Sequence, residues 1–380
     1  MKCCFFSPGY RSLAVLEGDT RTTGGAEAQI AHLAGALARS GHEAALIYGD
    51  GRGPVGQKLV CGVSCIDAAP SWRRPQSIVN FWRAMSAFSP DLLYARLPSD
   101  FLWIIGLFAR RHPAARFVYA MAHDLHCDPW TAYDYNPWFH APIYALGLRS
   151  ANVISVQHAH QERRLGERLR RRAVDVPNLV CSISLAARAY GAASFDAIWV
   201  AKIRPEKQLE YFLDLAAALP DLRFAVVGGF DPTVGAEIRL AFEGRLNGLP
   251  NLHFFGPQQA DKVFALLKAS RVLVNTSRFE GFPNTMLEAW SVGVPVVTLS
   301  VDPGGVIERE HLGLVSRTEA QLRGDVSTLS GLGSLNQRLG DNGLAYVRRR
   351  HSLEAVLQAL KRALSHVEFT ATASETRETQ

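Results

Sequence analysis

The sequence has 380 residues, of which 48% are hydrophobic and 20% are charged, and its formal net charge is +6. This length exceeds one ordinary core and suits two α/β domains, and the composition excludes a disordered or fibrous chain. Residues 1–6 run directly into Ser7-Pro8-Gly9, and the longest apolar stretch, 101–109, is too short to span a membrane. We therefore expect no signal peptide and a cytoplasmic location. The six cysteines lack paired metal-ligand spacing, which favours buried free thiols.

Short β-rich apolar runs alternate with amphipathic helical patterns along the whole chain. Strands are expected at residues 2–6, 44–48, 92–95, 116–121, 153–156, 197–200, 223–227, 252–255, 272–275 and 294–299. Helices are expected at residues 26–40, 78–88, 206–219, 233–246, 261–269, 284–292 and 336–349. The alternation is typical of parallel sheets covered by helices, so we predict an α/β protein with two Rossmann-like domains facing across a central cleft.

A stretch of small residues between two strand patterns, 181–195, marks the domain boundary. The predicted domains are residues 1–185 and 186–350. They are followed by a helix at 351–366 and a polar tail, 367–380, which we expect to be disordered.

The first candidate site residues are Gly24 and Gly25, which precede the helix predicted at 26–40. Glycines at a helix start permit close backbone approach to a phosphate or sugar, although a simple flexible turn has the same sequence. The segment is neither a dinucleotide fingerprint nor a phosphate-binding P-loop motif.

A histidine, His123, follows the strand predicted at 116–121, at the cleft end of that strand. A lone histidine is more often structural than catalytic, and His126 is a nearby alternative.

Basic residues cluster further along, on a helix and the turn after it: Arg163, Arg164, Arg168, Arg170, Arg171 and Arg172. Such a cluster is either a solvated face or a contact with an anionic membrane surface, worth about 1 kcal/mol per basic residue. Trp72-Arg73-Arg74 and the stretch 101–111 would add apolar and basic contacts to that surface. Nucleic acid is not an expected partner, because no recognisable binding module accompanies the charge.

Two lysines, Lys202 and Lys207, flank the turn between the first strand and first helix of the second domain. Two ammonium groups in the cleft would neutralise a leaving diphosphate in place of a metal ion, although a solvated loop has the same composition. Gly228 ends the next strand.

The most informative segment holds two carboxylates, Glu280 and Glu288, around the start of the helix predicted at 284–292. A helix that begins at the end of a parallel strand presents free N–H groups that suit a diphosphate, and Asn284 has the character of an N-cap. Two carboxylates beside a site for an anion would repel it, and their presence is explained if they accept hydrogen bonds from sugar and ribose hydroxyls. The simpler alternative is that acids suit the helix dipole.

The string from Glu280 to Glu288 resembles the Glu-x7-Glu motif of family 4 glycosyltransferases, which have the two-domain GT-B fold. The resemblance implies that Glu288 holds the donor ribose and Glu280 the transferred sugar, with phosphate and sugar contacts from Gly281, Phe282, Pro283, Asn284 and Thr285. It also implies that Gly24 and Gly25 border the diphosphate and that His123 contacts the donor sugar or acceptor. Gly228 matches the family's glycines at a strand end, which give the nucleotide room to approach. Pro205-Glu206-Lys207 matches a second family string, but Ala201-Lys202 stands where the family has Gly-Arg, which keeps a charge and loses the bidentate fork.

By the same resemblance, the first domain binds the acceptor, the second binds the nucleotide-sugar donor, and the helix at 351–366 crosses back to pack on the first domain. The implied enzyme is a retaining, metal-independent glycosyltransferase without a cofactor. UDP is favoured over GDP on family frequency alone, and the expected acceptor is a saccharide or polyprenyl-linked saccharide in bacterial surface polysaccharide synthesis.

Two other functions remain open from the sequence: a nucleotide-sugar epimerase of the same fold, and a non-catalytic sugar- or lipid-binding subunit. The second requires a damaged donor site, whereas Glu280, Glu288 and Lys207 are all present. A dehydrogenase is disfavoured by the missing dinucleotide fingerprint.

Overall fold

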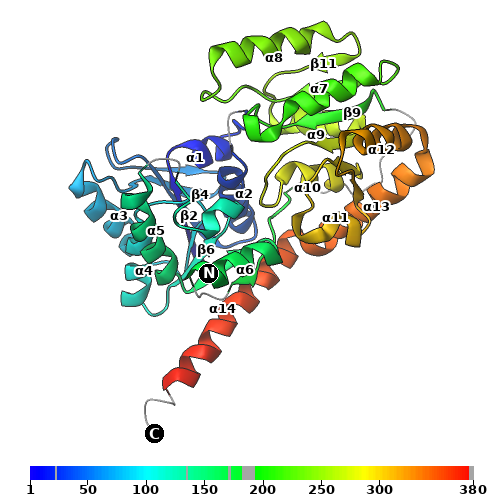
Figure 1. Cartoon of the computed structure of the whole chain (residues 1–380). Coiled ribbons are helices and arrows are strands. Elements are labelled where there is room, and N and C mark those ends of the chain that lie inside the picture. The colour runs from blue at the N-terminus through cyan, green and yellow to red at the C-terminus, as the bar shows by residue number, and fades with distance from the viewer. Residues whose placement is uncertain (22–23, 134–135, 170–172, 182–192, 376–380) are drawn as a thin grey trace. The chain divides into compact units, whose positions relative to one another are not determined.

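The computed structural model describes residues 1–21, 24–133, 136–169, 173–181 and 193–375, with side chains to residue 365 (Figure 1). The chain divides into two compact units. The N-terminal unit comprises Met1–Asp19, Thr23–Cys181 and Leu353–Gln380, and the C-terminal unit comprises Thr20–Thr22 and Ser182–Ser352.

Among its described residues, the N-terminal unit has an eight-stranded sheet in the order β3-β4-β2-β1-β5-β6-β7-β8. In the described part of this sheet, β3 and β4 are antiparallel and every other pair of neighbouring strands is parallel. The strands are β1 (Lys2–Pro8), β2 (Glu43–Gly49), β3 (Gly56–Val60), β4 (Val63–Asp67), β5 (Leu92–Ala95), β6 (Arg116–Ala120), β7 (Val153–Val156) and β8 (Val174–Asp175). The strand order reverses between β1 and β5, which makes their carboxyl ends the topological switch point.

Helices cover both faces of this sheet (Figure 1). They are α1 (Arg11–Leu16), α2 (Gly25–Arg39), α3 (Pro75–Phe88), α4 (Leu102–Arg111), the 3-10 helix η1 (Asp124–Cys127), α5 (Pro137–Ser150), α6 (Ala159–Leu169) and α14 (Leu353–Glu375). Successive β1 side chains alternate between faces, so Cys4 packs with α3 to α6 while Cys3 packs with α1, α2 and α14. Both faces of a parallel sheet are thus buried, as its apolar strands require.

The last helix, α14, packs on the N-terminal unit. Val356, Ala359, Leu360 and Ala363 form a buried stripe at helical spacing in the same core cluster as α2. The predicted return of the C-terminal helix to the N-terminal domain is therefore confirmed. The helix extends to Glu375, so most of the stretch predicted to be a disordered tail is helical, and residues 376–380 lie outside the described part.

The C-terminal unit has a six-stranded parallel sheet among its described residues, in the order β11-β10-β9-β12-β13-β14. This is the Rossmann order, and its switch point lies between β9 and β12. Its strands are β9 (Phe195–Val200), β10 (Phe224–Val227), β11 (Leu252–Phe254), β12 (Ser270–Asn275), β13 (Val296–Thr298) and β14 (Gly313–Val315). Its helices are η3 (Pro205–Lys207), α7 (Leu209–Ala218), α8 (Ala236–Gly248), α9 (Ala260–Lys268), α10 (Asn284–Ser291), η4 (Pro303–Gly305), α11 (Val306–Arg309), α12 (Glu319–Gly331) and α13 (Gly333–Arg350).

The prediction of two Rossmann-like parallel-sheet units is confirmed, and some local expectations need correction. Asn284 is the first residue of α10, and Pro283 occupies the N-cap position. The thiols of Cys61 and Cys181 are exposed, whereas the other four cysteines are buried as expected. In the part of the chain that the structure describes, no helix is long and apolar enough to cross a membrane.

Candidate active site

Four charged residues predicted for the donor site lie around one edge of the C-terminal sheet. Lys202 and Lys207 follow β9, Glu280 lies in the loop after β12, and Glu288 lies one turn into α10. Because β9 and β12 are parallel neighbours, their carboxyl ends meet at the same edge. This edge is the switch point of the Rossmann sheet, where ligands of such folds bind.

The loops after β9 and β12 are fastened to each other by hydrogen bonds. The Thr276 hydroxyl donates to the carbonyl of Lys207 at 2.7 Å and accepts from the buried indole N–H of Trp199 at 3.0 Å. The backbone N–H of Arg278 donates to the carbonyl of Glu206 at 2.9 Å. These bonds fix the position of Lys207 relative to the loop that carries Glu280.

Lys207 and Glu280 form an ion pair between the ammonium Nζ and the carboxylate Oε1. Only 20% and 14% of their side chains are exposed, so the pair is shielded more than a surface ion pair. Lys207 ends the short helix η3, and α7 begins only at Leu209, after Gln208 in a left-handed conformation with φ of 49°. The prediction that Lys207 lies at the start of the long helix is therefore wrong by two residues, because Lys207 ends the short helix before it.

A third basic residue of this loop, Arg204, was not singled out in the sequence. Its guanidinium donates to the carboxylate of Asp231 at 2.6 and 2.9 Å. Burial opposes ionisation of Asp231, but hydrogen bonds from Thr233 and Arg204 outweigh it and lower the pKa of Asp231 to about 2. The charge of Arg204 is therefore neutralised within the protein.

The packing of the chain at the end of β10 requires a glycine at position 228. Its φ is +143°, and a Cβ there would lie 1.8 Å from the carbonyl oxygen of Ala201. The glycine therefore allows the end of β10 to lie against the chain that leaves β9. The predicted approach of a nucleotide to Gly228 stays a prediction.

Glu288 lies on α10 and is partly buried. Burial raises the pKa of its carboxyl from 4.5 to about 7. The opposite side of α10 is anchored by Trp290, whose indole N–H donates to the carbonyl of Leu312 at 3.0 Å. A Cβ on Gly343 of α13 would lie 2.7 Å from the Trp290 ring, so the two helices pack closely enough to hold Glu288 in place.

The residues predicted to contact phosphate and sugar through their backbone lie at the start of α10. Gly281, Phe282 and Pro283 form the end of the preceding loop, and Asn284 and Thr285 are the first two helical residues. The Phe282 ring lies 5.4 Å from that of His351 and 6.3 Å from that of Trp290, which fixes the loop. Pro283 at the N-cap position makes no side-chain hydrogen bond to the helix, and the first N–H groups of an α-helix suit an anion.

In the N-terminal unit, Gly24 is the N-cap of α2 and Gly25 is its first residue. A Cβ on Gly24 would lie 2.4 Å from the carboxylate of Glu27, so this carboxylate lies over the helix start. Glu27 also pairs with Arg11 at 3.5 Å. A diphosphate at Gly24 and Gly25 therefore requires that the Glu27 carboxylate turn towards Arg11.

His123 lies after β6, as the sequence predicted, and its Nδ1 accepts the backbone N–H of Leu125 at 3.1 Å. This contact assigns the ring proton to Nε2 in the neutral imidazole. The alternative, His126, is different. Burial, with smaller effects of His123 and Arg96, lowers the pKa of His126 to about 3, so it stays neutral near pH 7.

The basic cluster is only partly described. Arg163 and Arg168 on α6 are exposed, and Arg168 pairs with the buried Asp128 at 3.1 Å. Arg164 donates to the carbonyl of Asp124 at 3.4 Å. The other predicted members, Arg170, Arg171 and Arg172, lie outside the described residues.

The sequence reasoning missed Arg96, which directly follows β5 at the switch point of the N-terminal sheet. Its side chain is 4% exposed and donates to Asn178 at 2.6 Å and to the Tyr94 hydroxyl at 3.3 Å. Among the described residues, no carboxylate pairs with this buried guanidinium. An arginine immediately after a buried strand pattern was the available signal. Also within the described residues, no group of three or more His, Cys, Asp or Glu is arranged to hold a metal ion.

Two family models match the chain, one in each unit. The model described as "Glycosyl transferase 4-like domain" matches residues 24–179, and "Glycosyl transferases group 1" matches residues 194–329. The fold and the charged edge of the C-terminal sheet thus define a glycosyltransferase of the GT-B class. The chain belongs to the group 1 glycosyl transferases of the family 4 type, as its Glu-x7-Glu string suggested.

Solved structures with this fold cover nearly the whole chain. Sucrose-phosphate synthase of Thermosynechococcus elongatus is 18% identical, with a TM-score of 0.70 over 98% of this chain and 100% of that one. Anabaena HepE, solved with UDP and glucose, is 16% identical, with a TM-score of 0.68 over 96% of this chain and 100% of that one. A curated relative, glycosyltransferase 1 domain-containing protein 1 of Xenopus tropicalis, is 28% identical over 138 residues, and the match spans 36% of this chain and 39% of that protein.

Proposed function

We propose that this glycosyltransferase uses a nucleotide-diphosphate sugar, with UDP as the nucleotide, and transfers the sugar with retention and without a metal ion. The observation that carries the proposal is the arrangement in the C-terminal unit. The Lys207–Glu280 pair, the start of α10 and the partly buried Glu288 all follow strands that meet at one switch point. The complexes of Anabaena HepE with UDP-glucose and with UDP and glucose support the choice of base.

In this proposal each charged group has a distinct task. The α10 N–H groups and the ammonium groups of Lys202 and Lys207 stabilise the diphosphate as negative charge develops on it. Glu288 accepts hydrogen bonds from the ribose hydroxyls, and Glu280 accepts them from hydroxyls of the transferred sugar while it holds Lys207 in place.

The proposed reaction is a substitution on one face of the sugar. The acceptor oxygen forms a bond to the anomeric carbon, the bond from that carbon to the diphosphate oxygen breaks, and the acceptor proton moves to the departing phosphate oxygen. The protein contributes positioning and charge stabilisation, and His123 orients the sugar or the acceptor. We do not assign Glu280 as a nucleophile, because its carboxylate is held by an ammonium group.

The experiment is incubation of the full chain with UDP-glucose, UDP-galactose and UDP-N-acetylglucosamine, with and without EDTA, followed by detection of released UDP. The proposal predicts UDP release that EDTA leaves unchanged, and an α-linked product when the donor is α-linked. Release that requires an added divalent cation contradicts metal independence, and a β-linked product contradicts retention. A free isomerised nucleotide sugar, formed without acceptor, establishes the epimerase alternative.

We further propose that the acceptor is a saccharide or polyprenyl-linked saccharide of a surface polysaccharide, used at an anionic membrane surface. Exposed Arg163 supplies positive charge, and exposed Arg168 beside it is paired with Asp128. Asp128, the ion-pair partner of Arg168, also accepts the backbone N–H of Trp130 at 3.0 Å. The ring of Trp130 lies 5.1 Å from that of Trp138, and the two side chains are 49% and 80% exposed. Tryptophan beside arginine is typical of surfaces that bind at membrane interfaces.

Co-sedimentation with vesicles tests this surface. We expect binding to vesicles that contain phosphatidylglycerol, little binding to pure phosphatidylcholine, and weaker binding for Trp138→Ser and Arg163→Gln. Equal binding of the wild type to both kinds of vesicle contradicts the membrane proposal and leaves the donor site unaffected.

A further inference from the structure

A pocket lies entirely within the N-terminal unit. Its volume is about 170 Å³, and it lies where β2 and β4 end and α3 begins. Its walls come from the loop after β2, the end of β4 and the first turns of α3: Gly51, Gly53, Val55, Asp67, Ala68, Ala69, Arg74, Gln76, Ser77 and Asn80.

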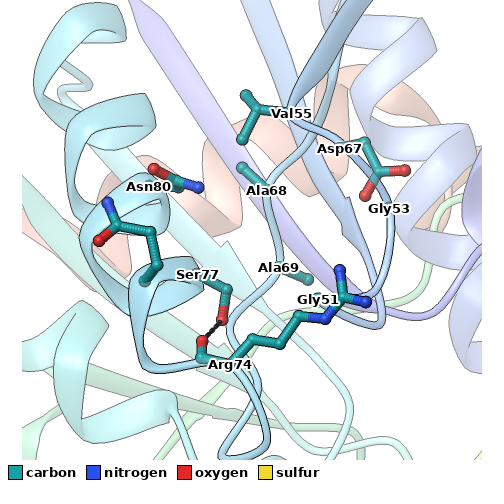
Figure 2. A pocket seen from close by; sticks show the side chains of 10 residues that line it. Gly51, Gly53, Val55, Asp67, Ala68, Ala69, Arg74, Ser77 and Asn80 are labelled. Carbon is teal, nitrogen blue, oxygen red and sulfur yellow. Dashed lines mark hydrogen bonds between the residues drawn. The ribbon is translucent and has the colours of Figure 1, made fainter.

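The polar groups of this pocket are arranged around an apolar floor. Figure 2 shows Asp67 and Asn80 on opposite sides, with Val55, Ala68 and Ala69 between them. The Arg74 guanidinium donates to the carbonyl of Arg52, in the loop after β2. The pocket therefore offers a carboxylate and a guanidinium on one side and an amide on the other.

The loop after β2 packs closely against the Asp67 carboxylate. A Cβ on Gly49 would lie 2.2 Å from Oδ1 of Asp67, and one on Gly53 would lie 3.0 Å from Oδ2. Gly51 has a φ of +72°, and a Cβ there would lie 2.5 Å from the Cβ of Ser71. The alternate glycines thus let the backbone turn tightly over the carboxylate, which accepts the Tyr10 hydroxyl at 3.2 Å.

Two amides of the α3 wall have unused hydrogen-bonding capacity. Gln76 and Asn80 are one helical turn apart, and within the described residues neither side chain has a hydrogen-bond partner. The hydroxyl of Ser77, in contrast, is satisfied, because it donates to Arg74 and accepts from Ser71. Each amide presents both donors and an acceptor to a ligand.

We propose that this pocket binds one pyranose residue of a neutral saccharide as an acceptor subsite. The proposal rests on the proposed function, because it assumes that the acceptor is a saccharide. Asp67 and the amides of Gln76 and Asn80 bond the hydroxyls, and the aliphatic floor packs against the C–H face of the ring. An anionic ligand such as a phosphate fits less well, because the Asp67 carboxylate repels it and the Arg74 guanidinium already donates to the carbonyl of Arg52.

The test is saturation-transfer NMR on the full chain with glucose, galactose, mannose and N-acetylglucosamine, each at millimolar concentration. We expect saturation of at least one sugar, and roughly tenfold weaker binding of that sugar to Asp67→Asn and Asn80→Leu, the effect of losing one or two hydrogen bonds. Asp67→Asn keeps an acceptor for Tyr10, so its fold is preserved. Asp50→Asn is the matched control, because Asp50 lies on the same loop and does not line the pocket.

The melting temperature and UDP binding are measured in parallel for every variant. Saturation of no sugar, or equal affinity in Asp67→Asn, Asn80→Leu and wild type, overturns the subsite even when UDP binds normally. Failure to bind UDP while sugars still bind contradicts the proposed function and leaves the subsite intact. A sugar affinity that falls equally in Asp50→Asn also overturns the assignment, because the effect then does not belong to the pocket.

Discussion

The titration of Glu288 gives a quantitative prediction for stability. Its carboxyl has a pKa of about 7 in the folded protein against 4.5 ordinarily, and burial is the cause. Below pH 4.5 the group is protonated in both the folded and unfolded states. As the pH rises towards 7, the unfolded chain ionises first, so the free energy of unfolding falls, and above pH 7 the loss is constant.

The size of the effect follows from the shift. At 1.36 kcal/mol per pKa unit, raising the pH from 4.5 to 8 costs the wild type about 2–3 kcal/mol relative to Glu288→Gln, which has no charge to bury. The assay is urea denaturation of both proteins at several pH values, with the difference in free energy of unfolding plotted against pH. Taking the difference between the two proteins cancels the pH dependence that comes from all other titratable groups. Parallel pH profiles for the two proteins would refute the reasoning.

The same carboxyl couples nucleotide binding to pH. If ribose hydroxyls donate to Glu288, the bound state needs the ionised form, and below pH 7 binding releases a proton. The dissociation constant for UDP is then expected to rise about tenfold for each pH unit below 7 in the wild type, and to stay high and nearly constant in Glu288→Gln. Calorimetric titration in buffers of different ionisation enthalpy measures the proton release directly. A wild-type affinity that does not change between pH 5.5 and pH 7 speaks against a ribose contact.

Three further predictions concern single residues. Lys207→Ala should lower the turnover about a hundredfold or more, because it removes charge stabilisation of the diphosphate, and a steady-state assay with unchanged turnover excludes that role. Gly228→Ala should destabilise the protein by about 3–5 kcal/mol in urea denaturation, because the new Cβ would overlap the carbonyl oxygen of Ala201. The control Gly244→Ala, at an open position of α8, should instead stabilise the protein by about 0.5–1 kcal/mol. A neutral Gly228→Ala would show that the packing there is looser than described. His123→Ala should lower the turnover about tenfold or more without changing the affinity for UDP, and a loss of UDP affinity instead would place His123 at the nucleotide.

The sequence predicted the parts of the fold with strong periodicity. The strands at 92–95 and 153–156 have the predicted bounds, because each is a short, buried β-rich run between turn residues. Four strands, β3, β4, β8 and β14, were missed, and β3 and β14 illustrate two different reasons. β3 has mostly exposed side chains, and β14 has only three residues, so neither shows a buried apolar pattern. Their pairing depends on neighbouring strands that are distant in the sequence.

For the site, the sequence correctly predicted that Glu280 lies in a loop after a strand and that Glu288 lies one turn into the following helix. The ion-pair and hydrogen-bond partners of the charged side chains could not be predicted from spacing along the sequence. The ion pair of Glu280 with Lys207 joins loops that are 73 residues apart in the sequence, and only the order of strands β9 and β12 brings them together. The burial of Arg96 likewise depends on Asn178, which is 82 residues away.

The central claim is that the C-terminal unit binds a uridine diphosphate without a metal ion. Thermal unfolding of the full chain with UDP, GDP, ADP and NAD, each with and without EDTA, tests it most directly. At a hundredfold excess over the dissociation constant, a bound nucleotide stabilises the folded state by about 2.7 kcal/mol, which shifts the melting temperature visibly. The account predicts a shift with UDP that EDTA leaves unchanged and that Lys207→Ala reduces. A shift with NAD alone, or with no nucleotide at all, contradicts it.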